Sequence, residues 1–458
     1  MFDKEADLPN SFVARIKGQF PEHANQIILG LDSASITSIQ KNILKPSEST
    51  PSGDILPWYE HGIILKKRFI FAADPLWHAG NYYVQEASSM FLGHVLSSLS
   101  LSPENLKVLD LCAAPGGKSH IIQNFLKDQG ILWSNEIIPG RAAILRDNLN
   151  RYGHANTIIS NSSPETLASA GLRFDIVVID APCSGEGMFR KDPGARKEWN
   201  PGSPGTCAIR QNHILNEAVE LVDENGFLIY STCTFAEEEN EDQIAVLLAT
   251  GEWESVEVPV DASWRIREIS KNGLFAYQFF PGITMAGEGF FISVLKRLSK
   301  PGQRRPKRSN KPAYSKLSNK EADALTPWIE SGKGGAFFKN NKENIFFFSK
   351  ELLEAFSFFD SDWHVFQAGI PVGHMKGSSF IPEHALALSL YKNNEILNAN
   401  LDLDSARTYL RGNDPGLHHF EGIGWHTVSC LRQALGWVKV MPNRVNNYYP
   451  KEQRLLHH

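Results

Sequence analysis

Two cysteines near the middle of the chain each follow a run of apolar residues typical of a buried strand. Cys183 ends the segment Phe174-Asp-Ile-Val-Val-Ile-Asp-Ala-Pro-Cys183, and Cys233 ends the segment Gly226-Phe-Leu-Ile-Tyr-Ser-Thr-Cys233. If the two runs are neighbouring strands of one parallel sheet, both thiols emerge at its carboxyl edge, where open α/β sheets bind their ligands. Two thiols that face one pocket suit a reaction that first adds a nucleophile to its substrate and then removes it.

A glycine-rich turn lies upstream of both cysteines, between a predicted strand over 106–112 and a predicted helix over 120–127. The turn reads Ala113-Ala-Pro-Gly-Gly-Lys118, and it matches neither a dinucleotide-binding GxGxxG nor a P-loop. Small residues let the backbone approach a ligand, and a helix N-terminus offers unpaired N–H groups. A second predicted strand ends at Glu136, 24 residues after the first strand, a spacing at which an acid commonly binds ribose hydroxyls. Together these features predict a site for a nucleotide-like ligand.

The composition is that of a globular protein with more than one domain. The chain has 458 residues, 42% of them hydrophobic and 21% charged, so we expect two or three cores. Its apolar runs fall far short of the ~20 residues that a membrane span needs. The acidic start of the chain lacks the pattern of a secretory signal, and we expect a cytoplasmic protein. The five cysteines are scattered and include no CxxC pair, which argues against a metal site.

The basic charge is concentrated in one stretch, although the net charge is −5. Ten Lys or Arg and no acid lie between Lys296 and Lys320, where Pro, Gly and Ser interrupt every possible helix or strand. The stretch therefore predicts an exposed linker. Such a linker is either a solvated tether or a footprint for phosphate.

Three strings carry a resemblance to a known family. Cys112-Ala-Ala-Pro-Gly-Gly-Lys118, Asp180-Ala-Pro-Cys-Ser-Gly-Glu-Gly187 and Tyr230-Ser-Thr-Cys-Thr234, in this order, resemble the motifs of the NOP/Sun family of RNA cytosine-5 methyltransferases. The segments 81–90 and 287–291 resemble the stretch that precedes that family's catalytic domain and its closing strand. The resemblance covers roughly residues 10 to 297.

The C-terminal part is similar to the PUA-like RNA-binding tail of the ribosomal small-subunit methyltransferase F group, on the strings Gly369-Ile-Pro-Val-Gly373 and Asn446-Asn-Tyr-Tyr-Pro-Lys451. The resemblance implies an α/β fold, in which a Rossmann-like S-adenosylmethionine methyltransferase sheet carries an N-terminal RNA-binding extension and a C-terminal PUA-like α+β region. The expected divisions are an N-terminal RNA-binding extension (1–100), a catalytic domain (101–297), a basic linker (298–320) and a PUA-like RNA-binding region (321–458).

The resemblance assigns catalytic roles to three residues. Carbon 5 of cytosine is a poor nucleophile because the ring is electron-poor, and a thiolate that adds to carbon 6 makes carbon 5 enamine-like. By resemblance Cys233 is this nucleophile. Asp180 would supply a proton or a hydrogen bond at ring nitrogen 3. Cys183 would assist the release of the enzyme thiol, as a base or by ordering one.

The same resemblance implies S-adenosylmethionine as the cofactor. Glu136 is expected on the ribose, with Arg141 nearby and Asp180 close to the methyl group. The expected backbone contacts come from the turn residues Cys112, Ala113, Ala114, Pro115, Gly116, Gly117 and Lys118. The family often places an Asp after its third strand to meet the adenine amino group, where this chain offers Asn161 and serines. An amide or a main-chain carbonyl then replaces that contact.

The expected partner is RNA, foremost small-subunit (16S) ribosomal RNA or the assembled subunit, with no membrane and no metal. The target base must leave its stack, because a duplex hides carbons 5 and 6. Tyr82, Phe189 and Trp199 could hold the base or could be core residues, and Arg190 and Lys191 could contact phosphate or be solvated.

Three other functions stay open at this point. Transfer RNA could be the substrate of the same chemistry. A catalytically idle RNA-binding assembly factor could keep the fold, although the intact cysteine pair argues against it. A small-molecule or protein methyltransferase would need neither the cysteine nucleophile nor a basic linker.

Overall fold

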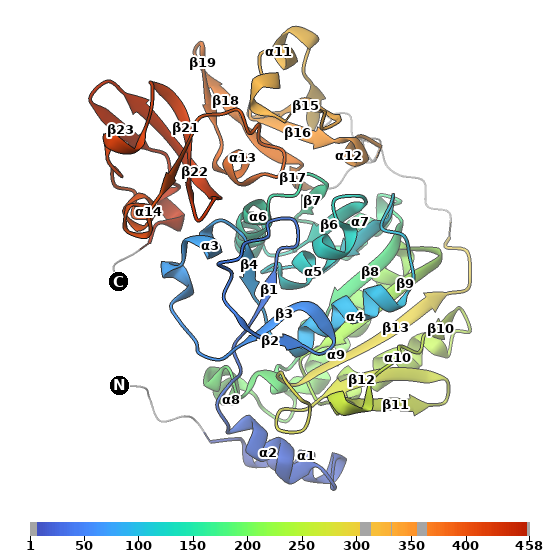
Figure 1. Ribbon diagram of the computed structural model, residues 1–458. Helices are drawn as coiled ribbons and strands as arrows, with labels where there is room; N and C mark the ends of the chain where they lie inside the picture. The colour runs from blue at the N-terminus through green and yellow to red at the C-terminus, as the bar shows by residue number, and fades with distance from the viewer. Residues whose placement is uncertain (1–6, 303–312, 331, 355–363, 456–458) are drawn as a thin grey trace.

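A ten-stranded central sheet carries an N-terminal body and a C-terminal body, which also contact each other (Figure 1). The computed structural model describes residues 7–302, 313–330, 332–354 and 364–455. In the view of Figure 1, the first two helices lie below the central sheet and the two C-terminal sheets lie above it.

The central sheet is mixed, with the strand order β11-β12-β13-β9-β8-β5-β6-β7-β17, and β10 pairs with β13. Its five middle strands are parallel, which confirms the predicted Rossmann-like sheet and the predicted pairing of the two cysteine-bearing strands. The strands of residues 101–297 are β5 (Lys107–Asp110), β6 (Ile131–Asn135), β7 (Thr157–Ser160), β8 (Phe174–Asp180), β9 (Val222–Thr232), β10 (Trp253–Ser255), β11 (Arg267–Lys271), β12 (Leu274–Phe279) and β13 (Phe290–Arg297).

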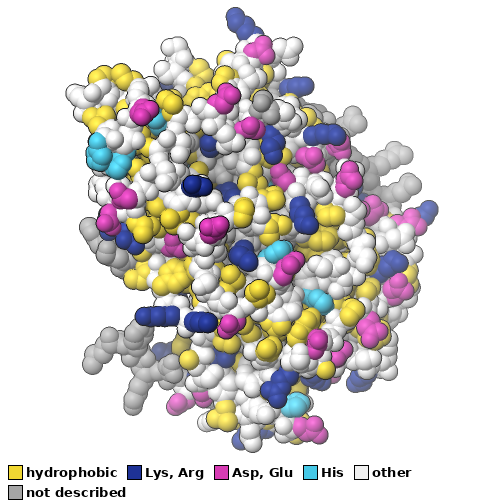
Figure 2. All heavy atoms as spheres, viewed as in Figure 1, with side chains coloured by type: hydrophobic (Ala, Val, Ile, Leu, Met, Phe, Trp, Pro, Cys, Tyr) yellow, Lys and Arg dark blue, Asp and Glu magenta, His cyan; other side chains and the backbone are white. Residues whose placement is uncertain are grey.

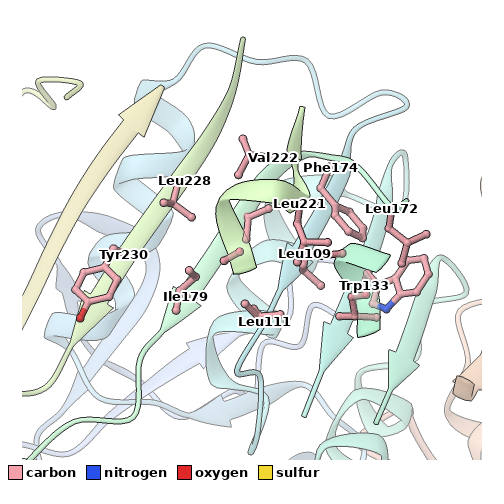
Figure 3. Close-up of a cluster of buried hydrophobic side chains, with 14 of the residues drawn as sticks. Leu109, Leu111, Trp133, Leu172, Phe174, Ile179, Leu221, Val222, Leu228 and Tyr230 are labelled. Atoms are coloured by element: carbon pink, nitrogen blue, oxygen red, sulfur yellow. The ribbon is translucent and has the colours of Figure 1, made fainter. Parts of the chain in front are cut away.

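Side chains of the middle strands point alternately to the two faces of the sheet, since the side-chain period of a strand is two. Val108 and Ile176 belong to the core on one face, and Leu109 and Val177 belong to the core on the other. Figure 3 shows the second of these cores, where Leu109 and Trp133 lie among side chains of β8 and β9. The strands are apolar on both faces because both faces are covered.

Helices cover the sheet on both sides. Residues of α4 and α5 pack into the core on one face, and residues of α7, α9 and α10 pack into the core on the other. Helix α6 begins with Pro139 in its first turn and ends at Gly153, whose φ of 91° suits a glycine cap. The bounds are α4 (Phe91–Ser98), α5 (Gly117–Leu126), α6 (Pro139–Tyr152), α7 (Pro164–Ser169), α8 (Pro193–Glu198), α9 (Ser203–Ala218) and α10 (Glu241–Leu248).

The N-terminal body combines two helices with a small antiparallel sheet of order β2-β3-β1-β4. Phe12 and Ile16 of the first helix pack with Phe189, Trp199 and Phe235 from the cysteine-bearing half of the chain, so the helix supports the loops after β8 and β9. The elements are α1 (Asn10–Gln19), α2 (Ala24–Leu31), β1 (Ser38–Lys41), β2 (Gly53–Leu56), β3 (Tyr59–Leu65), α3 (Pro75–His78) and β4 (Tyr82–Val84).

The C-terminal body contains a five-stranded sheet of order β14-β15-β16-β18-β19 and a four-stranded sheet of order β20-β21-β22-β23. Its strands are β14 (Tyr314–Lys316), β15 (Gly335–Asn340), β16 (Ile345–Ser349), β17 (Val365–Ala368), β18 (Ile370–Lys376), β19 (Ser379–Pro382), β20 (Asn398–Leu401), β21 (Gly424–Cys430), β22 (Gln433–Met441) and β23 (Arg444–Asn447). Its helices are α11 (Asn319–Asp323), α12 (Lys350–Glu354), α13 (His384–Leu388) and α14 (Leu403–Leu410).

The C-terminal body is less separate from the catalytic sheet than the division at residue 321 suggests. Strand β17 pairs antiparallel with β7 and forms one edge of the central sheet. Strand β14 lies inside the segment 298–320 that the sequence predicts to be a linker. Of that segment, the cluster of basic residues at 304–311 lies outside the described residues.

Across the described parts of the chain, no helix is both long and apolar enough to cross a bilayer. Nor do the described His, Cys, Asp and Glu residues form any group of three or more that could hold a metal ion.

Candidate active site

The two cysteines that follow β8 and β9 meet at the carboxyl edge of the sheet. The strands are parallel neighbours, with Asp180 opposite Ser231, so the loops that follow them start side by side. The Sγ atoms of Cys183 and Cys233 lie 3.0 Å apart. The backbone N–H of Cys233 also donates to the Cys183 sulfur, at 3.3 Å. The structure therefore brings both thiols into one site.

The environment of Cys183 keeps its sulfur protonated. The contact with the Cys233 thiol, and then burial, raise the pKa of Cys183 well above its ordinary value. A thiol with a raised pKa is a poor nucleophile at neutral pH, because the thiolate is the reactive form. A proton therefore has to leave this pair of thiols before a sulfur attacks carbon.

Glu239 joins the two cysteine loops. Its carboxylate accepts hydrogen bonds from the Ser184 N–H at 2.9 Å, the Gln211 amide at 3.0 Å and the Thr234 hydroxyl at 3.0 Å, as well as from the Ser184 hydroxyl. Ser184 follows Cys183 and Thr234 follows Cys233, so one buried carboxylate holds the two loops against each other. Burial raises the pKa of Glu239 above its ordinary value.

Glu186 is a second fully buried carboxylate beneath the same loops. It accepts from the Trp199 indole N–H at 2.9 Å, from the Thr234 hydroxyl at 3.1 Å and from the Phe235 N–H at 3.2 Å, and it pairs with Arg15 of α1. Neither carboxylate is among the site residues that the sequence predicts. The signal that could have found them is a Glu within a glycine-rich loop and another soon after Cys233, each without a basic neighbour in sequence.

Asp180, the last residue of β8, lies beside the cysteine loops and carries an ion pair. Its Oδ1 lies 2.8 Å from the Lys118 ammonium, and the Ser231 hydroxyl donates to it at 3.0 Å. The Lys118 ammonium also lies 5.1 Å from the centre of the Phe290 ring. Lys118 thus links the glycine-rich turn to the edge of the sheet that holds the cysteines.

The glycine-rich turn exposes backbone where larger residues could not fit. Gly116 has a φ of 116°, a conformation that favours glycine, and it caps α5. A Cβ on Gly117 would lie 2.1 Å from the side-chain oxygen of Gln85, so a larger residue there would displace the Gln85 side chain. Before the turn, Asp110 is fully buried, and no hydrogen bond within the described residues uses its Oδ1. That oxygen and the bare backbone fit a ligand with an ammonium group, such as S-adenosylmethionine.

Glu136 and Arg141 meet at the end of β6, on the far side of the turn. Arg141 lies 3.2 Å from the Glu136 carboxylate and donates to the Ala114 carbonyl at 2.7 Å. The Asn161 amide N–H group donates to the carbonyls of Glu136 and Ile137, at 2.6 and 2.9 Å. The amide oxygen of Asn161 is then left to meet an amino group, in the place where the family often has an Asp. These positions fit the ribose and adenine contacts that the resemblance implies.

Four of the residues that the sequence offers for base or phosphate contacts have structural roles instead. Tyr82, Phe189 and Trp199 are buried, at 1%, 0% and 8% exposure, so they are core residues and do not hold a base. Arg190 forms a buried ion pair with Glu288 at 2.7 Å and is not free to contact phosphate.

Two remaining candidates differ in exposure. Lys191 is exposed. Cys112 is half-buried, and burial raises the pKa of its thiol, which suits a packing role in the turn.

Three family models match the chain in the order of its three bodies. The N-terminal domain of 16S rRNA methyltransferase RsmF matches residues 8–87, the 16S rRNA methyltransferase RsmB/F matches residues 98–296, and the methyltransferase RsmF PUA domain matches residues 397–455. The five-stranded sheet of the C-terminal body lies between the last two matches.

Curated relatives and solved structures agree with these matches. Ribosomal RNA small subunit methyltransferase F of Vibrio cholerae serotype O1 (strain M66-2) is 30% identical over 411 residues, covering 87% of this chain and 85% of the relative. The protein of that name from Aliivibrio fischeri (strain ATCC 700601 / ES114) is 28% identical and covers 97% of both chains.

Two solved structures from Pyrococcus horikoshii share the fold. A methyltransferase homolog protein has a TM-score of 0.55 and 24% identity, over 63% of this chain and 95% of that one. NSun6 with the ligand SFG has a TM-score of 0.55 and 19% identity, over 65% of this chain and 100% of that one. By its sequence relatives, this chain belongs to the RsmB/F family of 16S rRNA methyltransferases, enzymes that take their methyl group from S-adenosylmethionine.

Proposed function

We propose that this chain methylates carbon 5 of a cytosine in small-subunit (16S) ribosomal RNA, through a covalent adduct between the cytosine and Cys233. The observation that carries the proposal is the pair of thiols, 3.0 Å apart, at the carboxyl edge of the sheet. S-adenosylmethionine supplies the methyl group when it is bound along the turn 112–118, with Glu136, Arg141 and Asn161 toward its nucleoside part.

Cys233 starts the reaction by adding to carbon 6 of the target base. The new carbon–sulfur bond breaks the 5,6 double bond, and the electron pair moves toward carbon 5 and ring nitrogen 3, which makes carbon 5 nucleophilic. Asp180 and Lys118 are adjacent to this site, and the Lys118 Nζ lies 2.8 Å from the Asp180 Oδ1 in an ion pair. The pair therefore supplies the hydrogen bond or proton that nitrogen 3 needs as charge accumulates there.

Cys183 completes the reaction. After methyl transfer, the proton on carbon 5 leaves to a base, the 5,6 double bond forms again, and the carbon–sulfur bond breaks to release the Cys233 thiolate. The raised pKa of Cys183 depends first on its contact with the Cys233 thiol. That contact changes once the Cys233 sulfur is bonded to carbon. One cause of the raised pKa of Cys183 is then removed at the step that needs a base, or a group that orders one, while burial continues to raise that pKa.

The substrate is inferred from the relatives and from the outer bodies. The relatives are named ribosomal RNA small subunit methyltransferase F, and residues 397–455 match their PUA domain. The N-terminal extension (1–100) and the C-terminal region (321–458) would then hold RNA around the catalytic domain (101–297), with the segment 298–320 between them. An enzyme acting on ribosomal RNA or on an assembled bacterial subunit would work in the cytoplasm.

The test uses labelled S-adenosylmethionine and ribosomal RNA from cells that lack this protein. Label is expected on carbon 5 of cytosine in small-subunit RNA. The variant Cys233→Ala should transfer no methyl group and still bind the cofactor. The variant Cys183→Ala should attack but release slowly, so that a protein–RNA adduct stable to denaturation accumulates. Cys207→Ala, a half-buried cysteine on α9, is the matched control and should behave like the wild type.

Several outcomes would contradict the proposal. Label on transfer RNA alone would show that the substrate is transfer RNA and not ribosomal RNA. Label only on protein or metabolites would show that RNA is not the substrate. Absence of any label, with RNA binding intact, would indicate an assembly factor. Turnover by Cys233→Ala would take the nucleophile role away from that residue.

A further inference from the structure

An open cavity of about 560 Å³ lies on the N-terminal body and has no role in the site described above. The segment after β3 forms one wall, with Arg68, Phe69 and Phe71. Strand β4 contributes Tyr83, and helix α6 contributes Asn148. Its volume is within the range of pockets that bind small ligands, about 300–1,000 Å³.

The cavity shares a wall with the cofactor turn. The Asn148 side chain donates to the Pro115 carbonyl at 2.8 Å. Strand β4 leads directly to Gln85, whose side chain lies against Gly117. Lys118, the next residue, reaches Asp180 beside the cysteines. A strand of RNA whose target base enters the cysteine site would thus have the cavity nearby.

A second hollow, of about 380 Å³, continues from the first past Trp77 and Asn148. Its far wall consists of residues 452–455, at the end of the region that matches the PUA domain. The two hollows are therefore neighbours, and the second lies between the N-terminal body and the C-terminal body.

Aromatic rings with exposed faces line the cavity. Phe69 is 36% exposed and Ile70 is 55% exposed, and the rings of Phe69 and Phe71 lie 4.6 Å apart. Phe71 itself packs against the core of the N-terminal sheet, which holds the pair in place. Single exposed apolar residues are common on proteins. Two such residues in succession, Phe69 and Ile70, beside the ring of Phe71 and in a cavity, form a surface on which a base can stack.

Three consecutive basic residues precede the aromatic ones. Lys66, Lys67 and Arg68 are all exposed, and no ion pair or hydrogen bond of their side chains is found among the residues the structure describes. In Figure 2, dark blue side chains project beside a yellow patch at the left edge, over the loop that Figure 1 draws after β3. Free cations next to exposed aromatic rings match the needs of a single RNA strand, which offers phosphates and unstacked bases.

We propose that this cavity binds an unstacked nucleotide of the RNA substrate, outside the target cytosine. The base stacks on Phe69, which Phe71 holds in place, and Arg68 with the two lysines contacts the phosphates on either side. The inference rests on the proposed function, because it names where that same RNA is held. A surface for a protein of the ribosomal subunit would need apolar area without this basic run, and it is an outcome of the test below.

The first experiment measures methyl transfer by the full chain to 16S rRNA at several salt concentrations. Phe69→Ala should raise the KM for RNA about tenfold, the loss of one base–aromatic stack, with kcat and cofactor affinity unchanged. In RNA binding measured at the same salt concentrations, Arg68→Ala should lower the slope of log Kd against log salt by about 0.7, as expected for one phosphate contact on a single strand. The matched controls are Val246→Ala on α10 and Lys271→Ala on β11, both exposed, and both should equal the wild type.

The second experiment crosslinks the wild-type protein to 16S rRNA that contains 4-thiouridine. A crosslinked peptide spanning residues 66–73 is expected. If Phe69→Ala matches Val246→Ala and no crosslink falls in this peptide, the inference is wrong even though methyl transfer by the wild type persists. The same inference is tested on assembled small subunits with a crosslinker at residue 69, and capture of a ribosomal protein without RNA also overturns it. Failure of the wild type to methylate RNA at all would instead contradict the proposed function.

Discussion

Asp110 is predicted to make the stability of the protein fall as the pH rises. Its side chain is fully buried at the end of β5, where one oxygen accepts from the Ser119 hydroxyl at 2.7 Å and the other has no hydrogen bond within the described residues. Burial raises its pKa from 3.8 to about 7. The perturbation that isolates this carboxyl group is Asp110→Asn, which keeps the shape and removes the ionisation.

The magnitude follows from the difference between the two pKa values. Between pH 3.8 and about 7 the folded protein holds a proton at Asp110 that the unfolded chain has released. Stability from this group is therefore fully present below pH 3.8 and is lost as the pH rises through about 7. A shift of about three units at 1.36 kcal/mol per unit corresponds to about 4 kcal/mol.

The assay is urea unfolding of the wild type and Asp110→Asn from pH 4 to pH 8, without cofactor. The free energy of unfolding of the variant minus that of the wild type should rise by about 4 kcal/mol across this range. Taking the difference removes the contributions of other titrating groups. Ser119→Ala should extend the wild-type loss to higher pH, since the serine hydrogen bond lowers the pKa of Asp110. A difference between the two proteins that stays constant with pH would refute the reasoning.

Three further predictions concern the loops around the cysteines. Glu239→Ala leaves buried donors without an acceptor and should lower the free energy of unfolding by about 3 kcal/mol. Glu239→Gln can still accept hydrogen bonds and should lower it by about 1 kcal/mol. Equal losses for the two variants in urea unfolding would show that the Glu239 carboxylate does not hold the two cysteine loops together. Lys118→Met removes the cation 2.8 Å from Asp180 and should lower kcat about a hundredfold in the methyl-transfer assay, and an unchanged kcat would exclude the pair from proton supply. Gly187→Ala places a Cβ 2.3 Å from the Gly289 carbonyl oxygen and should lower the free energy of unfolding by about 2 kcal/mol. A thermal unfolding midpoint equal to that of the wild type would show that the backbone at Gly187 and Gly289 can move apart to make room.

Much of the catalytic sheet could be predicted because its signals are local. The apolar runs that end in Asp180 and Cys233 are strands buried on both faces. A continuous apolar run of this kind is typical of a strand inside a parallel sheet that is covered on both faces. The glycine-rich turn is likewise visible in the sequence, since the φ of 116° at Gly116 favours glycine.

The edges of the domains could not be predicted in the same way. Strand β17 joins the central sheet from a region more than 200 residues beyond β7. Its short sequence does not indicate which strand it pairs with. Composition predicts that the segment 298–320 is a linker, yet Tyr314 begins a strand, and the Ala368 N–H donates to the Tyr314 hydroxyl oxygen at 2.9 Å. Pairing between strands so far apart in the sequence depends on which sheet edges are still unpaired in the folded chain. The composition of a segment does not indicate this.

By itself the sequence determined the fold class, the methyl-donor turn and the two thiols, because each depends on a few residues at fixed spacing along one strand and the loop after it. Only the tertiary structure decided how Glu186 and Glu239 hold the cysteine loops together, and that Tyr82 is core while Phe69 faces solvent. The physical reason is that burial and hydrogen-bond partners are set by residues brought from elsewhere in the chain. A carboxylate or an aromatic ring has the same letter in the sequence whether it is locked in the interior or open to a ligand.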